Sequence, residues 1–108
     1  MKIYTTKTFE ASHQLKEMGK CANLHGHTYR AEVWVDYDYK KEVFDFGLIK
    51  EIIEKLDHTY LNDIIDYPTV EALVEYIIEE IKLNNPNFNL LKVRIWEGLD
   101  NYAEEEIK

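Results

Sequence analysis

The spacing of apolar residues changes its period twice along this chain, and that change constrains the fold more than any other feature. Between His25 and Tyr37, apolar and polar residues alternate, which predicts a half-buried β-strand. Between Leu48 and Ile81, apolar residues recur every three or four positions, which predicts amphipathic helices. Alternation returns over Leu90–Glu97. Strands on both sides of a helix pair predict an α+β fold, with two helices on one face of a mainly antiparallel sheet.

Local composition predicts the remaining strands. Ile3–Glu10 is rich in Thr, Tyr and Phe, which favour strands. A short third strand is predicted over Val43–Phe46. The acidic stretch Glu104–Glu106 either adds an edge strand or frays. The residues expected to share one face of the strand over 90–97 are Leu91, Val93 and Ile95. A small open sheet leaves edges that pairing between subunits can protect.

Capping residues set the helix boundaries. An apolar stripe places the first helix over Leu48–Leu56. The second helix is predicted to begin after Pro68, with Thr69 as its N-cap. It is predicted to stop at Asn84-Asn85-Pro86, because proline cannot continue a helix.

Length and composition exclude several classes of protein. The 108 residues support a single domain over residues 1–108, and 45% hydrophobic with 31% charged residues is an ordinary globular balance. A net charge of −8 argues against a nucleic-acid partner, which needs clustered Lys and Arg. A single cysteine, Cys21, excludes an internal disulfide framework and fits a reducing cytosol. No apolar run has signal-peptide or membrane-spanning length, so we expect a soluble cytoplasmic protein with no membrane partner.

Three histidines suggest a metal site. His25 and His27 stand two residues apart at the start of a predicted strand, so their side chains project to the same face. His13 ends the preceding strand and can supply a third nitrogen. Three neutral imidazoles with an open position are the coordination of a catalytic zinc. The alternative is that each ring is an ordinary polar residue, since short motifs often match by chance.

The only cysteine has three possible roles. Cys21 lies four residues before His25. It can be a fourth ligand, which would close the site into a structural zinc module. It can instead be a thiolate that works beside an open metal position. The third role is that of a small buried hydrophobic residue.

Two further sites carry residues with acid–base chemistry. Asp57 and His58 stand at the predicted end of the first helix, where Asp57 can orient the imidazole and His58 can carry a proton. The alternative for His58 is a C-terminal residue favoured by the helix dipole. Glu97 ends an apolar strand face, where a carboxylate either reaches solvent or meets a ligand with paired N–H donors.

Together these segments resemble the family of 6-pyruvoyltetrahydropterin and 6-carboxytetrahydropterin synthases. The resemblance covers nearly the whole chain and follows the order of the family's motifs. The segments that carry it are Phe9-Glu10-Ala11-Ser12-His13, Cys21-Ala22-Asn23-Leu24-His25-Gly26-His27, Asp45-Phe46, Leu56-Asp57-His58-Thr59-Tyr60-Leu61-Asn62-Asp63, Pro68-Thr69-Val70-Glu71 and Val93-Arg94-Ile95-Trp96-Glu97.

The resemblance implies a fold and an assembly. The fold is the tunnelling fold (T-fold), an antiparallel sheet with two helices on one face. Its subunits associate through an oligomeric barrel, so the resemblance implies a homo-oligomer, a hexamer built as a dimer of trimers.

The resemblance also implies roles for the candidate residues. Zinc is the implied cofactor, held by His13, His25 and His27. Cys21 is the implied proton acceptor, in a relay with the Asp57–His58 pair that a neighbouring subunit often supplies. Glu97 is implied to anchor the pterin ring. The segment with Thr69 and Glu71 is implied to line the pterin pocket.

The implied activity is that of a zinc-dependent lyase. A cysteine before the His-Gly-His string and a short single domain favour 6-carboxy-5,6,7,8-tetrahydropterin synthase, which acts on 7,8-dihydroneopterin triphosphate in the biosynthesis of 7-deazapurines such as queuosine and archaeosine. The alternatives are 6-pyruvoyltetrahydropterin synthase, and a divergent pterin enzyme on an unphosphorylated substrate, since a charge of −8 suits a triphosphate poorly. A non-enzymatic structural zinc module, with one cysteine and three histidine ligands, is the alternative from another class.

Overall fold

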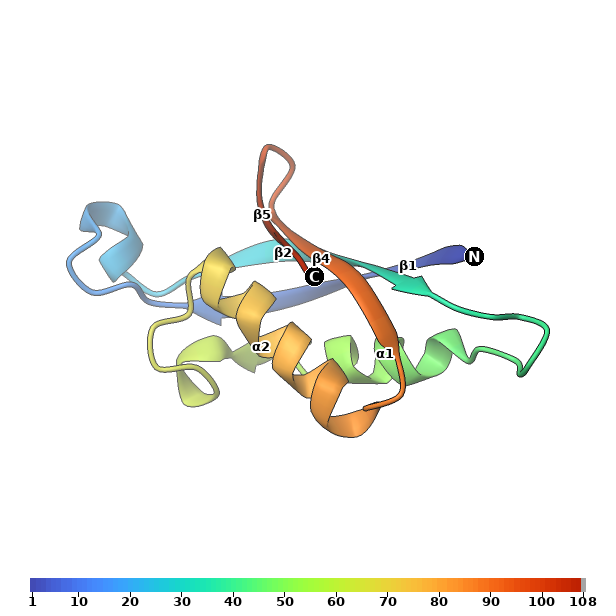
Figure 1. Cartoon of the computed structure of the whole chain (residues 1–108). Coiled ribbons are helices and arrows are strands. Elements are labelled where there is room, and N and C mark those ends of the chain that lie inside the picture. Colours follow the sequence, from blue (N-terminus) through green and yellow to red (C-terminus); the bar gives the residue numbers. More distant parts are fainter. Residues whose placement is uncertain (108) are drawn as a thin grey trace.

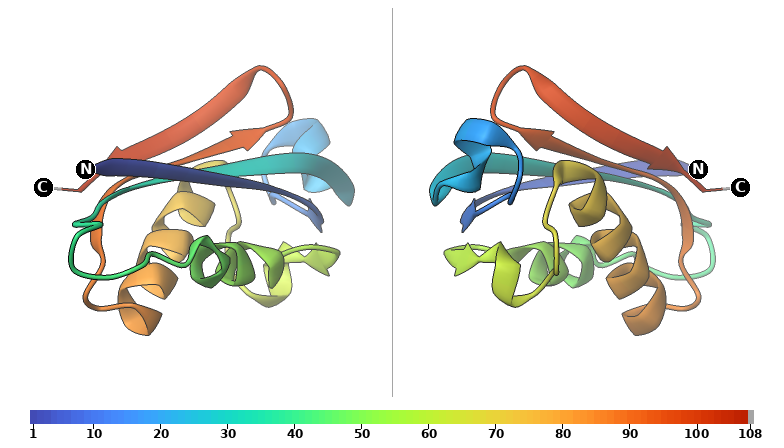
Figure 2. Two further views of the ribbon diagram at one scale, coloured as in Figure 1. Left: turned by 90° about the vertical axis from the view of Figure 1, so that its right-hand side faces the viewer. Right: turned by 90° about the vertical axis from the view of Figure 1, so that its left-hand side faces the viewer.

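One layer of strands and one layer of helices make up the structure. The computed structural model describes residues 1–107, so Lys108, the last residue of the predicted domain, lies outside the described residues. Figure 2 shows both helices beneath the same face of the sheet. Along the chain the elements are β1 (Lys2–His13), η1 (Gly19–Ala22), β2 (His25–Asp36), α1 (Phe46–Glu54), β3 (Thr59–Tyr60), η2 (Leu61–Asp63), α2 (Val70–Asn84), β4 (Asn89–Glu97) and β5 (Asn101–Glu106) (Figure 1).

The five strands lie in the order β3-β1-β2-β4-β5. All neighbours are antiparallel except β3, which runs parallel to β1. The predicted α+β fold with a mainly antiparallel sheet and both helices on one face is therefore confirmed. The acidic stretch near the C-terminus forms the edge strand β5.

A long hairpin positions the histidines. The β1–β2 register runs without interruption from the Lys2–Asp36 pair to the His13–His25 pair. Residues directly opposite each other in neighbouring strands present their side chains on the same face. The strand pairing therefore brings the end of β1 and the start of β2 together, at the end of the sheet that also carries η1.

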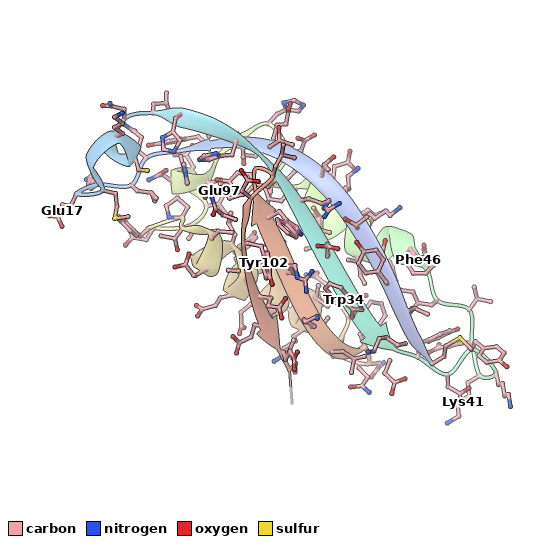
Figure 3. All side chains as sticks on the ribbon, turned by 90° about the horizontal axis from the view of Figure 1, so that it is seen from above. Glu17, Trp34, Lys41, Phe46, Glu97 and Tyr102 are labelled. Atoms are coloured by element: carbon pink, nitrogen blue, oxygen red, sulfur yellow. The ribbon has the colours of Figure 1, made fainter. Side chains whose placement is uncertain are left out.

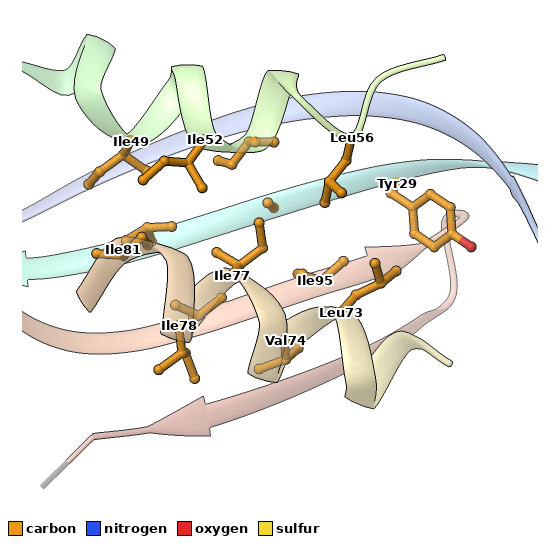
Figure 4. Packing of buried hydrophobic residues seen from close by; sticks show 14 of the residues in the cluster. Tyr29, Ile49, Ile52, Leu56, Leu73, Val74, Ile77, Ile78, Ile81 and Ile95 are labelled. Atoms are coloured by element: carbon orange, nitrogen blue, oxygen red, sulfur yellow. The ribbon is translucent and has the colours of Figure 1, made fainter. Parts of the chain in front are cut away.

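The core lies between the sheet and the helices. Each helix buries one apolar stripe against the alternate residues of β1, β2 and β4 (Figure 4). Thr69 caps α2 as predicted, because its hydroxyl accepts a hydrogen bond from the Ala72 backbone N–H at 3.2 Å. The fully buried residues of the stripes include Ile49, Ile53, Leu56, Leu73, Ile77 and Ile81.

Two local predictions are wrong. Val43–Phe46 does not form a strand: Asp45 caps α1, which begins at Phe46, and Phe44 packs on Phe88 with ring centroids 4.8 Å apart. In β4, Leu90 is buried in place of Leu91. The register between β2 and β4 shifts between Trp34 and Val35, and this irregularity turns the neighbouring residue toward the core.

The molecule is elongated, with extents of 51 × 22 × 21 Å. Figure 3 shows Glu97 toward the end of the sheet where the loop with Glu17 lies, with Lys41 at the opposite end. Within residues 1–107, no helix is long and apolar enough to cross a bilayer.

Candidate active site

Three histidine side chains gather at one end of the sheet. His13 pairs with His25 across the β1–β2 hairpin, and Ala11 pairs with His27, so all three imidazoles lie on the helix-facing side. One nitrogen from each ring lies within 4.8 Å of the other two. His13 is buried, and His25 and His27 are half-buried. This donor set can hold a metal ion.

The hydrogen bonds of the rings favour a bound cation. The Nδ1 atoms of His13 and His25 lie 2.8 Å and 2.7 Å from the carbonyl oxygens of Pro68 and Asn23. A carbonyl oxygen only accepts, so each Nδ1 carries the proton and each Nε2 presents a lone pair. These two Nε2 atoms lie 2.9 Å apart. A cation between them removes this repulsion, and a backbone carbonyl on the other ring nitrogen is the usual support for a metal-bound histidine.

Tyr29 and Glu97 complete the surroundings of the cluster. They pair across β2 and β4, and the Glu97 carboxylate lies 3.7 Å from His27 Nε2. Burial lowers the pKa of His27, although Glu97 acts in the opposite direction. The Tyr29 hydroxyl lies 3.4 Å from His13 Nδ1. Burial, together with the charge of Glu97, raises the pKa of Tyr29. The lowered pKa of His27 favours the neutral imidazole that binds a metal.

Cys21 lies outside the histidine cluster. Among residues 1–107, the group of possible ligands at this position consists of the three histidines alone. Cys21 is half-buried in the short helix η1, and its backbone N–H donates to Met18 at 3.1 Å. This arrangement agrees better with an open metal position than with a closed site of one cysteine and three histidines.

The Asp57–His58 pair is held against the edge of β1. Asp57 Oδ1 accepts the Glu10 backbone N–H at 2.8 Å, and the His58 backbone N–H donates to the Glu10 carbonyl at 2.6 Å. His58 has φ of 56°, a left-handed conformation that costs a non-glycine residue about 1–2 kcal/mol. Its Nε2 lies 3.5 Å from Asp57 Oδ2. This pair follows the end of α1, so it belongs to a strained turn rather than to a helix cap.

One open hollow of about 560 Å³ adjoins both groups. His27 and His58 line it, together with Glu10 and Tyr60. The His58 side chain is 78% exposed, so its imidazole is free to meet a ligand there. His27 of the cluster and His58, whose imidazole can carry a proton, therefore border the same open hollow.

The structure gives Thr69 a structural contact and leaves Glu71 at the surface. Thr69 caps α2, and Glu71 is exposed in its first turn. Pro68, which precedes Thr69, binds His13 through its carbonyl. The start of α2 therefore touches the cluster through the backbone.

Sequence reasoning missed several residues that shape this site. Tyr29 has the pattern of an ordinary core residue, and only its place two residues after His27 pointed to the cluster. Glu10, Pro68 and Tyr60 act through backbone atoms or from a two-residue strand, which leave no periodic signal.

Comparisons with known proteins agree with this geometry. The model of the family 6-pyruvoyl tetrahydropterin synthase matches residues 2–107. A 6-carboxy-5,6,7,8-tetrahydropterin synthase of Synechocystis is 38% identical over 74% of this chain and 74% of its own. A dihydroneopterin monophosphate aldolase of Pyrococcus furiosus is 37% identical over 97% of this chain and 96% of its own.

A solved structure shows the same fold. The 6-pyruvoyl tetrahydropterin synthase of Caenorhabditis elegans superposes with a TM-score of 0.82 at 24% identity, over 100% of this chain and 96% of that one. The architecture is therefore the predicted T-fold. With the match over residues 2–107, this chain belongs to the 6-pyruvoyl tetrahydropterin synthase family.

Proposed function

We propose that this protein is a zinc-dependent lyase, a 6-carboxy-5,6,7,8-tetrahydropterin synthase that acts on 7,8-dihydroneopterin triphosphate in the biosynthesis of 7-deazapurines. The observation that carries the proposal is the cluster of His13, His25 and His27, with facing lone pairs, beside a hollow that His58 lines. Membership of a tetrahydropterin synthase family supports the pterin substrate and the lyase class.

The histidines would hold the zinc ion, and the other residues would bind substrate and move protons. Zinc bound there would act as a Lewis acid that acidifies the side-chain hydroxyls of the substrate. The Cys21 thiolate would remove a proton from carbon, and His58 would accept or return one. Asp57 would keep the His58 imidazole oriented, which its 3.5 Å separation supports.

Glu97 would anchor the pterin ring. Its carboxylate ends β4 beside His27, and two oxygens can accept two parallel N–H bonds from the pyrimidine half of a pterin. Thr69 and Glu71 would line the same pocket from the start of α2. The cap bond of Thr69 would hold that turn in place.

The assembly would be a homo-oligomer, a hexamer made of two trimers, with residues 1–108 as one domain. The sheet supports this, since β3 covers only Ala11 and Ser12 at the outer edge of β1. Within the described residues, the rest of that edge and the far side of β5 have no neighbouring strand. Two free edges on opposite sides suit subunits that pair into a ring. Sedimentation at the monomer mass across micromolar concentrations would contradict this assembly.

A second candidate is an aldolase that acts on dihydroneopterin monophosphate. The Pyrococcus furiosus relative of that name is 37% identical and aligns over 97% of this chain. The net charge of −8 also suits a triphosphate poorly. One of the cations, Arg30, already lies 3.8 Å from Glu32 and stacks on Trp96. Lys16 and Lys20 are the exposed cations of the segment between β1 and β2, which also carries Cys21.

One experiment separates these activities. The purified protein is incubated with zinc and with the triphosphate, the monophosphate or dihydroneopterin itself, and the products are identified by mass spectrometry. We expect 6-carboxytetrahydropterin from the triphosphate. A 6-pyruvoyl product would assign the other synthase activity. Cleavage of the monophosphate alone would assign the aldolase, and equal rates with dihydroneopterin would reject a phosphorylated substrate.

A further inference from the structure

We propose that Gln14 is a positioning residue for Cys21, and that Tyr60 and Asn62 hold it in place. This inference rests on the proposed role of Cys21 as the base. Gln14 directly follows His13, at the point where the chain leaves β1 and enters the loop that carries Cys21. Its backbone and its side chain are both bound by the segment that follows His58.

The Asn62 side chain binds the backbone of Gln14 in the way that a further residue of β3 would. The parallel pairing of β3 with β1 ends at the Ser12–Tyr60 pair. Beyond it, the Gln14 backbone N–H donates to Asn62 Oδ1 at 2.9 Å, and Asn62 Nδ2 donates to the Gln14 carbonyl at 2.9 Å. One side-chain amide thus satisfies both backbone groups of the residue after His13 and fixes the direction in which the chain leaves the sheet.

The Gln14 side chain then connects Tyr60 with the Cys21 helix. The Tyr60 hydroxyl donates to Gln14 Oε1 at 2.6 Å, which orients the amide. Gln14 Nε2 donates to the carbonyl of Ala22, the residue after Cys21, at 3.4 Å. Tyr60 also lines the hollow beside His27 and His58. A chain of hydrogen bonds therefore leads from the wall of the hollow to the residue next to the thiol.

The loop between Gln14 and Cys21 is closed on itself. The Leu15 backbone N–H donates to the Cys21 carbonyl at 2.8 Å, and the Leu15 side chain is buried. The Tyr67 hydroxyl adds a separate bond to the Lys16 carbonyl at 2.6 Å. These bonds tie the two ends of the loop together, so the hydrogen bond from the Gln14 amide to Ala22 restrains where Cys21 stands relative to the hollow.

Thiol alkylation tests the restraint, because Cys21 is the only cysteine in the chain. Gln14→Met removes the amide at similar volume, and Tyr60→Phe removes only the hydroxyl. In the zinc-loaded protein at fixed pH, we expect each variant to raise the iodoacetamide rate by about fivefold, the effect of one lost hydrogen bond. The alkylation rate of the double variant should rise by less than the product of the two single increases, because both substitutions break the same chain of hydrogen bonds.

Turnover tests the positioning role. With zinc content unchanged, we expect kcat on the pterin substrate to fall about tenfold or more in both variants, with a smaller change in KM. Asn84→Ala and Tyr76→Phe serve as matched controls, since their hydrogen bonds to Glu80 on α2 lie away from this loop. Both controls should keep the wild-type alkylation rate and kcat.

The outcomes are separable. Equal alkylation rates in wild type and Tyr60→Phe would overturn the restraint, even if Gln14→Met failed to fold. Faster alkylation with an unchanged kcat would show a tether that does not position a base, and would also overturn the proposal. A wild-type protein without pterin turnover would reject the proposed function, while the alkylation rates would still decide the restraint.

Discussion

The two faces of the sheet each bury a polar group, and they differ in what satisfies it. On the helix-facing side, His13 is 1% exposed and belongs to the three-histidine cluster. On the opposite side, Glu32 is 6% exposed near the middle of β2. Burial of either group is costly unless it is paired.

Glu32 finds all of its partners within the protein. The Tyr4 hydroxyl and the Trp96 indole N–H donate to its two carboxylate oxygens, and Arg30 and Arg94 lie within 3.9 Å. Burial opposes its ionisation, but these donors and cations together hold the pKa of Glu32 below its usual value. The aromatic rings around it, including Trp34 and Tyr102, lie on the same face (Figure 3).

The histidine cluster is not satisfied in this way. Each Nδ1 of His13 and His25 has a backbone carbonyl, but the two Nε2 lone pairs face each other at 2.9 Å. A buried group with internal partners stabilises a fold, whereas a buried group with converging lone pairs is suited to a ligand. Substitutions in the two clusters should therefore separate function from stability.

The largest effect is expected for His27→Ala. Loss of one of three ligands should reduce zinc from one per chain to a trace and lower turnover by about 1,000-fold or more, because the Lewis acid is lost. Metal analysis by mass spectrometry and the pterin assay measure this. His58→Ala is the matched control, since His58 lies outside the cluster and that variant should keep its zinc. Full zinc content in His27→Ala would contradict the view that the histidine cluster binds a ligand while Glu32 stabilises the fold.

Cys21→Ala tests whether the three histidines form a metal site with an open coordination position or a closed site with Cys21 as the fourth ligand. We expect the variant to fold and to keep one zinc per chain, and to lose about 100- to 10,000-fold in kcat, the usual contribution of a general base. Metal analysis, circular dichroism and the pterin assay test the three parts. Loss of zinc together with unfolding would instead support a structural site in which Cys21 is the fourth ligand.

How far the sequence alone predicts this molecule depends on the kind of signal. The two-residue spacing of His25 and His27 and the strand alternation fully determine that both rings share a face. The same alternation failed at Leu91, because a register irregularity opposite Trp34 shifts the buried position by one residue. Strand patterns carry no information on where a register changes.

The surroundings of the candidate site were less predictable. The supports of His13 and His58 are backbone carbonyls and amides of Pro68 and Glu10, and any residue type supplies these groups. The strand β3 has two residues, too few for a period, and the left-handed turn at His58 has no glycine to mark it. The polar partners of Glu32 come from three strands, so only the tertiary fold brings them together.

Glu32→Gln tests the buried carboxylate on the sheet face opposite the helices, whose partners all lie within the protein. The amide offers only one acceptor oxygen, so Tyr4 or Trp96 loses its partner, and the charges of Arg30 and Arg94 lose theirs. We expect the free energy of unfolding in urea to fall by about 2–4 kcal/mol, with zinc content unchanged. Glu106→Gln, an exposed carboxylate on β5, is the control and should change stability by less than about 0.5 kcal/mol.

The same residue predicts a pH dependence. Because the pKa of Glu32 in the folded protein lies below the usual glutamate value of 4.5, its contribution to stability is complete above about pH 4.5 and is lost as the pH falls through the folded-state pKa. The stability difference between wild type and Glu32→Gln should therefore be constant above about pH 4.5 and shrink as the pH falls below it. Urea titrations at several pH values measure it, and a constant difference would show that Glu32 stabilises the fold without its charge.

The smallest effect is expected at Thr69, where a structural contact adjoins the histidine cluster. Thr69→Ala removes the cap of α2 and should cost about 1 kcal/mol of unfolding free energy, while Thr69→Ser should keep most of it. Because the Pro68 carbonyl that binds His13 immediately precedes the cap, the alanine variant should also weaken zinc binding slightly, by less than the 10- to 100-fold typical of a residue that orients a ligand directly. Competition with a chelator measures zinc affinity and urea titration measures stability. A loss of zinc affinity of more than about 100-fold, with unchanged stability, would show that Thr69 supports the histidine cluster rather than the fold.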